Sequence, residues 1–142
     1  KAEILRRYYQ TRKNNYLGRF DDSTLDKIDL LMNKVNVAPL DRKCVKPAIN
    51  KFNKCEEPSV CIQLNNGKLI TGKRSSLLGS ASAALINALK ELAGIDDDIL
   101  LIEREIIEPI CGLKINSLGH HNPRLHVAEA LIALSDLYFE AS

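Results

Sequence analysis

A stretch containing glycine and lysine, residues 67–73, has the spacing GxxxxGK of a phosphate-binding P-loop. In a P-loop the backbone amides wrap a phosphate, the lysine contacts its outer oxygens, and a following Ser or Thr binds Mg²⁺. Here Arg74 stands at the Ser or Thr position, and the residues between the two glycines have the pattern of a strand. The spacing matches the motif, but the sequence does not predict a P-loop.

Basic and hydroxyl residues at the end of this stretch favour anion binding in a different way. They stand just before a predicted helix, whose unpaired N-terminal amides and dipole attract negative charge. The serine hydroxyls can instead cap the helix, and both interpretations stay open. The candidate anion-binding residues are Gly72, Lys73, Arg74, Ser75 and Ser76.

Histidines gather near the end of the sequence, at His120, His121 and His126. His126 and Glu129 are three residues apart, so on a helix they share a face and can act as base and partner or as two metal ligands. No third ligand follows at a fixed spacing, and we predict no metal site. The candidate catalytic residues are His126, as a general base, and Arg124, holding a phosphate; structural hydrogen bonding is the alternative.

Other residues with metal-binding chemistry are an acidic run and four cysteines. Asp96, Asp97 and Asp98 carry carboxylates that suit hard cations, but adjacent side chains diverge, and such a run is typical of a solvated turn. The cysteines form no CxxC pair, so we expect reduced thiols in a cytosolic protein. The sequence contains no GxSxG, HExxH or GxGxxG motif.

The composition is that of a packed globular protein, with 45% hydrophobic and 27% charged residues. The net charge of +2 is small and both signs are interspersed, which argues against nucleic acid or a membrane surface as a partner. No apolar run reaches the roughly 20 residues of a membrane span, and no signal peptide opens the chain. We therefore expect a cytoplasmic protein.

Hydrophobic periodicity and capping residues predict the elements that position these candidates. Helices are expected over residues 1–17, 23–36 and 41–56, the second capped by Ser23 and the third bent by Pro47. Short apolar runs around Asn65-Asn66-Gly67 predict a hairpin of residues 60–64 and 68–71. A helix at residues 75–94 should follow, ending at Gly94, and then a buried strand at residues 99–102. Two more helices are expected at residues 104–118 and 122–139. Asn122, before Pro123, should cap the last one.

These elements predict an α/β protein with a helical subdomain at residues 1–56 and an α/β subdomain at residues 57–142. Small residues early in the helix of residues 75–94 should let another element approach it closely. The chain opens at Lys1 in what has the pattern of a helix interior, so we expect the natural protein to extend upstream.

Five strings, in order along the chain, resemble the C-terminal region of a bacterial family, domain of unknown function 1846. The resemblance runs from about Glu3 to Ser135, and some members of that family are labelled ATP-dependent peptidases. The strings are EILRRYY at residues 3–9, TGK at 71–73, GIDDDI at 94–99, IEPI at 107–110 and NPRLH at 122–126.

The resemblance implies an α/β subdomain of cytidine-deaminase-like topology. Zinc deaminases of that topology need H-x-E or C-x-E at the helix after the hairpin and P-C-x-x-C at the next one. The first helix here starts with Leu78-Gly79-Ser80-Ala81-Ser82 and the second contains a lone Cys111, so deamination is not expected. Relative to the family pattern, Arg74 replaces a small hydroxyl residue and His120-His121 replaces a Ser-Lys-like pair.

Two functions follow as hypotheses. In the first, the chain is a C-terminal module that packs on an upstream nucleotide-binding domain and offers an anion-binding or self-association surface for a phosphate-bearing small molecule or a second copy. In the second, His126 and Arg124 form part of the active site of a phosphate-ester or nucleotide-dependent enzyme. The sequence specifies no cofactor. Convergence of His126, Arg124 and Ser75 on one pocket would favour the enzyme.

Overall fold

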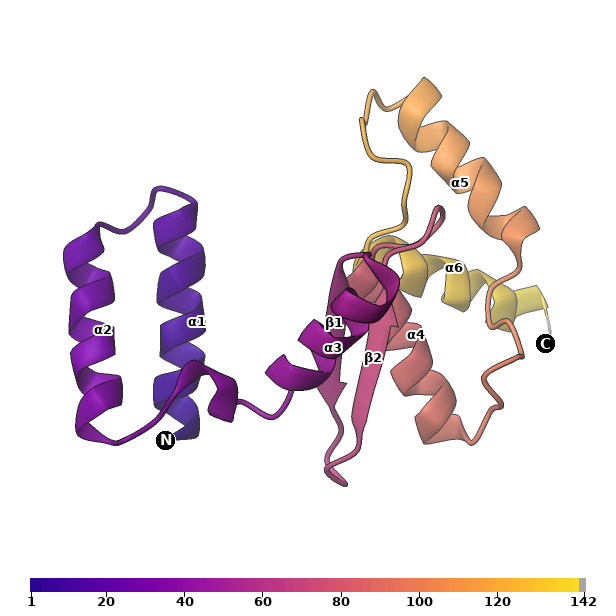
Figure 1. The fold of residues 1–142 in the computed structure, drawn as a ribbon. Coiled ribbons are helices and arrows are strands. Elements are labelled where there is room, and N and C mark those ends of the chain that lie inside the picture. Colours follow the sequence, from indigo (N-terminus) through magenta and orange to yellow (C-terminus); the bar gives the residue numbers. More distant parts are fainter. Residues whose placement is uncertain (141–142) are drawn as a thin grey trace. The chain divides into compact units, whose positions relative to one another are not determined.

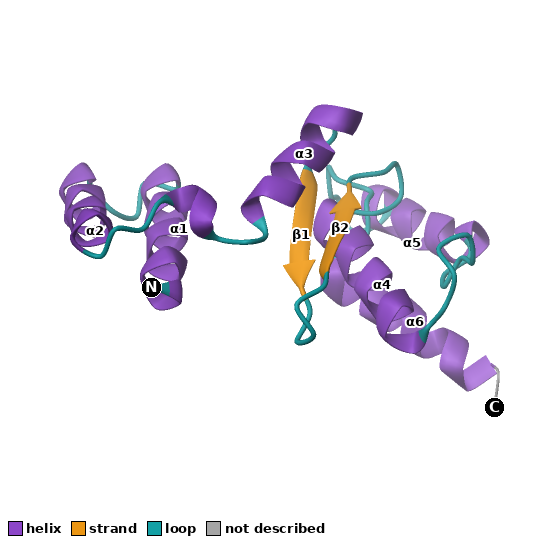
Figure 2. Cartoon of the chain, turned by 60° about the horizontal axis from the view of Figure 1, so that its bottom comes forward, coloured by secondary structure: helices purple, strands orange, loops and turns teal. Residues whose placement is uncertain are grey.

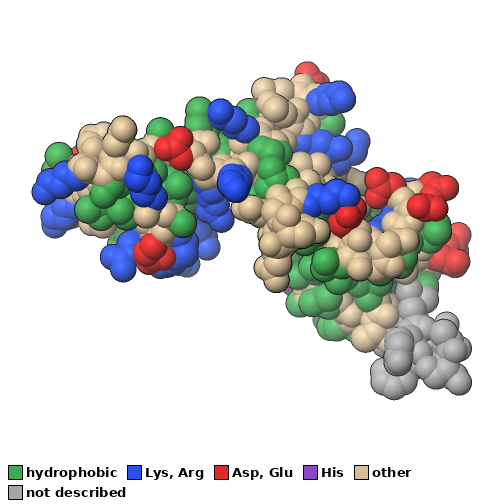
Figure 3. Space-filling view, turned by 90° about the horizontal axis from the view of Figure 1, so that it is seen from below, with side chains coloured by type: hydrophobic (Ala, Val, Ile, Leu, Met, Phe, Trp, Pro, Cys, Tyr) green, Lys and Arg blue, Asp and Glu red, His purple; other side chains and the backbone are tan. Residues whose placement is uncertain are grey.

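The computed structural model describes residues 1–140, with side chains described through residue 135. The chain separates into two compact units, Lys1–Lys46 and Pro47–Ser142. Residues 47–56, which the sequence assigned to the helical subdomain, group with the hairpin in the second unit. Charged side chains of both signs are interspersed on the face shown in Figure 3, as the sequence suggested.

The first unit is a pair of helices, α1 (Ala2–Tyr16) and α2 (Asp22–Lys34), followed by a short 3₁₀ helix, η1 (Pro39–Asp41). The two helices lie side by side (Figure 1) around the buried side chains of Leu5, Met32 and Val37. The cap of α2 is Asp21, whose carboxylate accepts from Thr24 N at 3.1 Å, and not Ser23 as predicted. A carboxylate accepts hydrogen bonds more strongly than a hydroxyl does, which favours the earlier start.

The second unit begins with α3 (Val45–Cys55), most of which it contains, and an antiparallel hairpin of β1 (Ser59–Gln63) and β2 (Leu69–Lys73). The hairpin prediction is confirmed, with Gly67 at a φ of 86° in the turn. Residues 69–73 are a strand and not a phosphate-wrapping loop. Pro47 lies in the first turn of α3, where its missing N–H is not needed, so it does not interrupt the helix.

Helix α4 (Ser80–Ala93) packs against both strands of the hairpin (Figure 2). The amide of Asn87 donates to Thr71 O at 2.9 Å and ties the helix to β2. Gly94 ends the helix in the left-handed conformation, as predicted, but α4 starts several residues later than expected. The start is late because Ser75 accepts hydrogen bonds from the backbone N–H of Leu77 and Leu78 and turns the chain first.

The predicted strand at residues 99–102 is wrong: these residues form bends and irregular backbone before α5 (Arg104–Asn116). Ile102 is buried in the core, whereas Leu100 is 73% exposed. The apolar run therefore supplies core contacts, but the two strands of the described sheet pair only with each other. An apolar run indicates burial and cannot by itself specify a pairing partner. The acidic residues before it form an exposed turn, with Ile99 N donating to Asp96 O at 3.2 Å.

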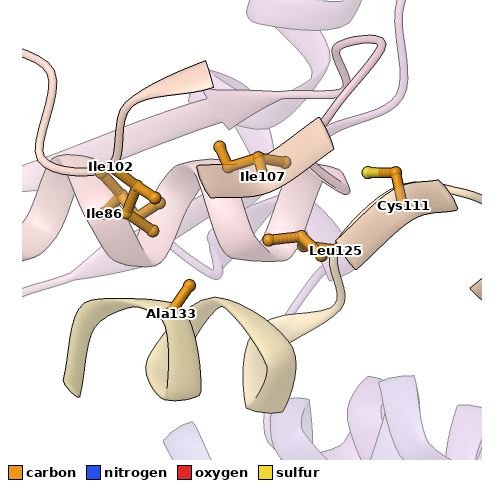
Figure 4. Close-up of a cluster of buried hydrophobic side chains, with 6 residues drawn as sticks. All are labelled: Ile86, Ile102, Ile107, Cys111, Leu125 and Ala133. Atoms are coloured by element: carbon orange, nitrogen blue, oxygen red, sulfur yellow. The ribbon is translucent and has the colours of Figure 1, made fainter. Parts of the chain in front are cut away.

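Helix α6 (Val127–Glu140) follows a long connection and packs against α4. The predicted cap at Asn122 is wrong, because Asn122 accepts from Arg124 N in a local turn and the helix begins after His126. The core of the unit, drawn in Figure 4, joins α4, α5 and α6 through one cluster of buried side chains. Its members are Ile86, Ile102, Ile107, Cys111, Leu125 and Ala133.

The structure is thus a mixed helical protein with a two-stranded antiparallel sheet, consistent with the predicted α/β class. Among the described residues, none of the helices combines the length and the apolar character that crossing a bilayer would require.

Candidate anion-binding site

The two segments that lead into α4 and α6 run side by side in the same direction. Leu78 and Leu125 form a parallel β-bridge. Leu125 N donates to Leu77 O at 2.8 Å, and Gly79 N donates to Leu125 O at 3.1 Å. Helix α4 begins at Ser80 and α6 begins at Val127, each two residues beyond its bridge partner. The N-termini of the two helices therefore start next to each other.

Small side chains at the start of α4 allow this close approach. The Ser82 hydroxyl donates to Leu125 O at 2.8 Å, and both residues are almost fully buried. A Cβ on Gly79 would lie 3.5 Å from Leu125 O, so even one added methyl group would touch the neighbouring segment. The sequence expectation that another element approaches this helix is confirmed.

A surface pocket of about 610 Å³ opens at the paired helix starts. Its basic lining comes from Arg74, Arg124 and His126. The first residues of both helices, 79–82 and 127–128, line it as well, together with Pro58 and Asn122. Unpaired amides and the positive ends of two helix dipoles thus face the same space as two guanidinium groups, an arrangement that suits an anion.

Each arginine is held by one hydrogen bond from its Nε. Arg74 Nε donates to the Glu57 carboxylate at 2.8 Å, and Arg124 Nε donates to Ser75 O at 2.6 Å. Within the described residues, the terminal guanidinium nitrogens form no further hydrogen bond, and neither does the exposed His126 ring. An arginine has five N–H donors, so both can bind a ligand while keeping these contacts.

Glu129 and the buried Lys114 do not line the pocket but hydrogen-bond to residues that do. Lys114 Nζ donates to Glu129 Oε2 at 2.7 Å, and the same oxygen accepts from His126 N at 2.7 Å. Burial raises the pKa of Glu129, but the hydrogen bonds from Lys114 and His126 N outweigh it, so the pKa lies below its usual value. Glu129 is therefore held as a carboxylate that caps α6, and it contacts the backbone of His126 rather than its ring.

The candidates that were predicted from sequence separate into two groups. Arg74, Arg124 and His126 line one pocket, and Ser75 is next to it through its carbonyl oxygen. The others are not among the lining residues. Gly72 contacts the backbone of α4, and Lys73 and Ser76 are exposed. Both His120 and His121 are exposed in the connection that follows α5.

Sequence reasoning missed Asn122 as a lining residue, and Glu57 and Lys114 as partners of site residues. Lys114 belongs to an ordinary helix with no motif, and Glu57 is far from Arg74 in sequence. No local signal marks either residue. In the described part of the chain, no group of three or more His, Cys, Asp or Glu side chains is placed to hold a metal ion.

Comparison with known proteins places the chain in a family. The family described as "Domain of unknown function DUF1846, C-terminal" matches residues 40–137. A UPF0371 protein of Streptococcus pyogenes serotype M5 (strain Manfredo) is 49% identical over 135 residues, which is 95% of this chain and 27% of that protein. A UPF0371 protein of Streptococcus sanguinis (strain SK36) is 49% identical over 133 residues, with 94% and 27% covered.

The chain thus spans about a quarter of the length of these relatives, 27% in both cases. The match to the C-terminal description covers both the hairpin and the pocket residues. The resemblance noted from the five sequence strings is confirmed, and the chain belongs to the DUF1846 family, whose C-terminal domain it contains.

Proposed function

We propose that the second unit is an anion-binding module that takes a phosphate-bearing small molecule at the paired starts of α4 and α6. The parallel bridge between Leu78 and Leu125 carries this proposal, because it brings two helix N-termini to one pocket. Each helix start stabilises a neighbouring anion by about 0.3–1 kcal/mol. Arg74 and Arg124 add donors whose planar geometry fits phosphate oxygens.

In the whole protein, this module packs on an upstream nucleotide-binding domain in the cytoplasm. The length of the relatives supports an additional region, since the chain covers 27% of them. Besides binding an anion, the module would offer a surface for packing or self-association. Exposed apolar side chains on α5 and α6 support this second role. They include Leu113 at 53% exposed, Leu131 at 47% and Ile132 at 60%. The cytidine-deaminase-like topology stays a proposal as well.

Titration of the full protein with inorganic phosphate and pyrophosphate, by calorimetry and thermal shift, tests the binding function. A ligand at 100 times its dissociation constant should stabilise the native state by about 2.7 kcal/mol. Arg124→Gln should weaken binding by tenfold or more, since a hydrogen bond to a charged group contributes about 1.5–3 kcal/mol. Arg74→Gln should act in the same direction.

Arg104→Gln is the matched control. Arg104 is an exposed arginine of the same unit, paired with Glu108 on its own helix and outside the pocket. Its replacement should leave binding unchanged. Equal affinity of the Arg124 variant and the wild type, or equal losses in the Arg104 and Arg124 variants, would contradict the proposed site.

The second candidate function is catalysis on a phosphate ester or nucleotide. The position of His126 favours it, since this residue lines the same pocket as Arg124 and its ring has no hydrogen bond within the described residues. His126 would act as general base while Arg124 holds the phosphate. In the full protein, His126→Asn should then abolish ester hydrolysis and preserve phosphate binding; retained turnover would exclude His126 as the base.

A further inference from the structure

We propose that Lys114 is the positioning residue of the anion pocket, although it belongs to α5 and does not line the pocket. The inference rests on the proposed anion-binding function and deepens it. It concerns how Arg124 and His126 are held in place, and how the pocket keeps its positive character beside an acidic residue.

One ammonium group links the backbones of both pocket residues. Lys114 Nζ donates to Arg124 O at 2.6 Å and to Glu129 Oε2 at 2.7 Å. Glu129 Oε2 in turn accepts from His126 N at 2.7 Å. Lys114 thus fixes the chain on both sides of Leu125, the residue that forms the bridge to the start of α4. A shift of this segment would move the Arg124 and His126 side chains together.

The charge of Lys114 also matters for the ligand. Glu129 is a carboxylate in the first turn of α6, close to the pocket lining at residues 127–128. Without a partner, its negative charge would repel a phosphate and oppose the two helix dipoles. Lys114 is only 3% exposed, and a buried ammonium is costly unless it is paired and hydrogen-bonded. Both of its hydrogen bonds here go to the pocket's own framework.

A second buried lysine of the same unit gives the contrast. Lys90 is 5% exposed and lies in the last turn of α4, at the opposite end of the helix from the pocket. Its Nζ donates to Asp97 O in the acidic turn. Lys90 therefore holds a loop in place with the same type of buried ammonium, but it contacts no pocket residue. It is a matched control for the general effect of removing a buried lysine.

The test is calorimetry of phosphate binding to four forms of the full protein. They are the wild type, Lys114→Met, Lys90→Met, and the double variant Lys114→Met/Glu129→Gln. Loss of Lys114 should weaken inorganic phosphate binding by about tenfold, the effect of roughly 1.4 kcal/mol. The double variant should recover only part of the affinity, because the unpaired carboxylate is gone but the hydrogen bond to Arg124 O is still missing. Lys90→Met should bind phosphate as the wild type does, even where it lowers the melting temperature.

Amide NMR spectra without ligand provide a second, independent measurement. Lys114→Met should shift the His126 amide signal and speed its hydrogen exchange, whereas Lys90→Met should not. If the wild type binds no phosphate, the proposed function fails, and these spectra alone decide the positioning role. Unchanged phosphate affinity together with an unchanged His126 amide in Lys114→Met would overturn the inference. If the single variant does not fold, the double variant, with its charge removed, carries the comparison.

Discussion

Gly72 of β2 lies directly against the backbone of Ala84 in α4: a Cβ added to Gly72 would come within 2.1 Å of Ala84 N. This distance is far below van der Waals contact, and the obstacle is backbone rather than a flexible side chain. The glycine therefore sets how closely the helix packs on the hairpin. Its place in a P-loop-like spacing reflects helix packing in this structure.

Replacing Gly72 by alanine should destabilise the protein by about 3 kcal/mol or more, because the strand and helix must separate. Urea unfolding of the variant measures the change. Gly112→Ala, in α5, is the control: the nearest atom to its added Cβ is 3.9 Å away, so there is room for the methyl group. That change should stabilise α5 by about 0.5–1 kcal/mol. Similar results for both glycines would contradict the packing role.

Leu125 should be the most sensitive position of the bridge between the two helix starts. It is 0% exposed and belongs to the core cluster of the second unit. Leu125→Ala should cost about 2–5 kcal/mol in the free energy of unfolding through lost burial and a residual cavity. Leu118→Ala, at a position that is 62% exposed, should change stability little. Chemical denaturation of both variants gives the comparison, and a loss below about 1 kcal/mol at Leu125 would argue against the packed bridge.

Stability at acid pH should depend on Glu129. Its pKa is lowered in the folded protein: burial raises it, but the hydrogen bonds from Lys114 and His126 N lower it further. Its contribution is therefore fully present above the ordinary value of 4.5 and is lost as the pH falls through the lower folded value. Urea midpoints should be recorded from about pH 3 to pH 6, which spans the range where a carboxyl group titrates. Glu129→Gln should lose less stability over this range than the wild type does.

Glu105→Gln is the control for that pH series. Glu105 is exposed at the start of α5 and has no ion pair within the described residues. The acid limb of this variant should follow that of the wild type. A wild-type slope in Glu129→Gln would show that the carboxylate does not couple folding to pH.

Cys111 should be the least reactive of the four thiols. It is buried in the core cluster, and burial raises its pKa, which lowers the fraction of reactive thiolate. Cys44 and Cys55 are only partly buried. Timed alkylation of the native protein, followed by mass spectrometry, should label Cys111 last. In denaturant all four thiols should be labelled at a common rate, which would show that the difference comes from the fold.

The sequence by itself determined the local elements whose causes are local. Asn65-Asn66-Gly67 specifies the hairpin because few residues accept the positive φ found at Gly67. Gly94 marks the end of α4 for the same reason. Arg74 was identified by its position before a helix, His126 by its helical spacing to Glu129, and Arg124 by its residue type beside His126; all three line the pocket.

Only the tertiary structure decided how these pieces meet. Residues 99–102 have the composition of a buried strand, but strand pairing needs a partner edge, which the composition of one segment cannot specify. The bridge between Leu78 and Leu125 joins residues far apart in the chain, and the Lys114 and Glu129 ion pair joins two helices. Backbone hydrogen bonding and burial of charge select such contacts from the whole fold, so the shared pocket of two helix starts becomes visible only in three dimensions.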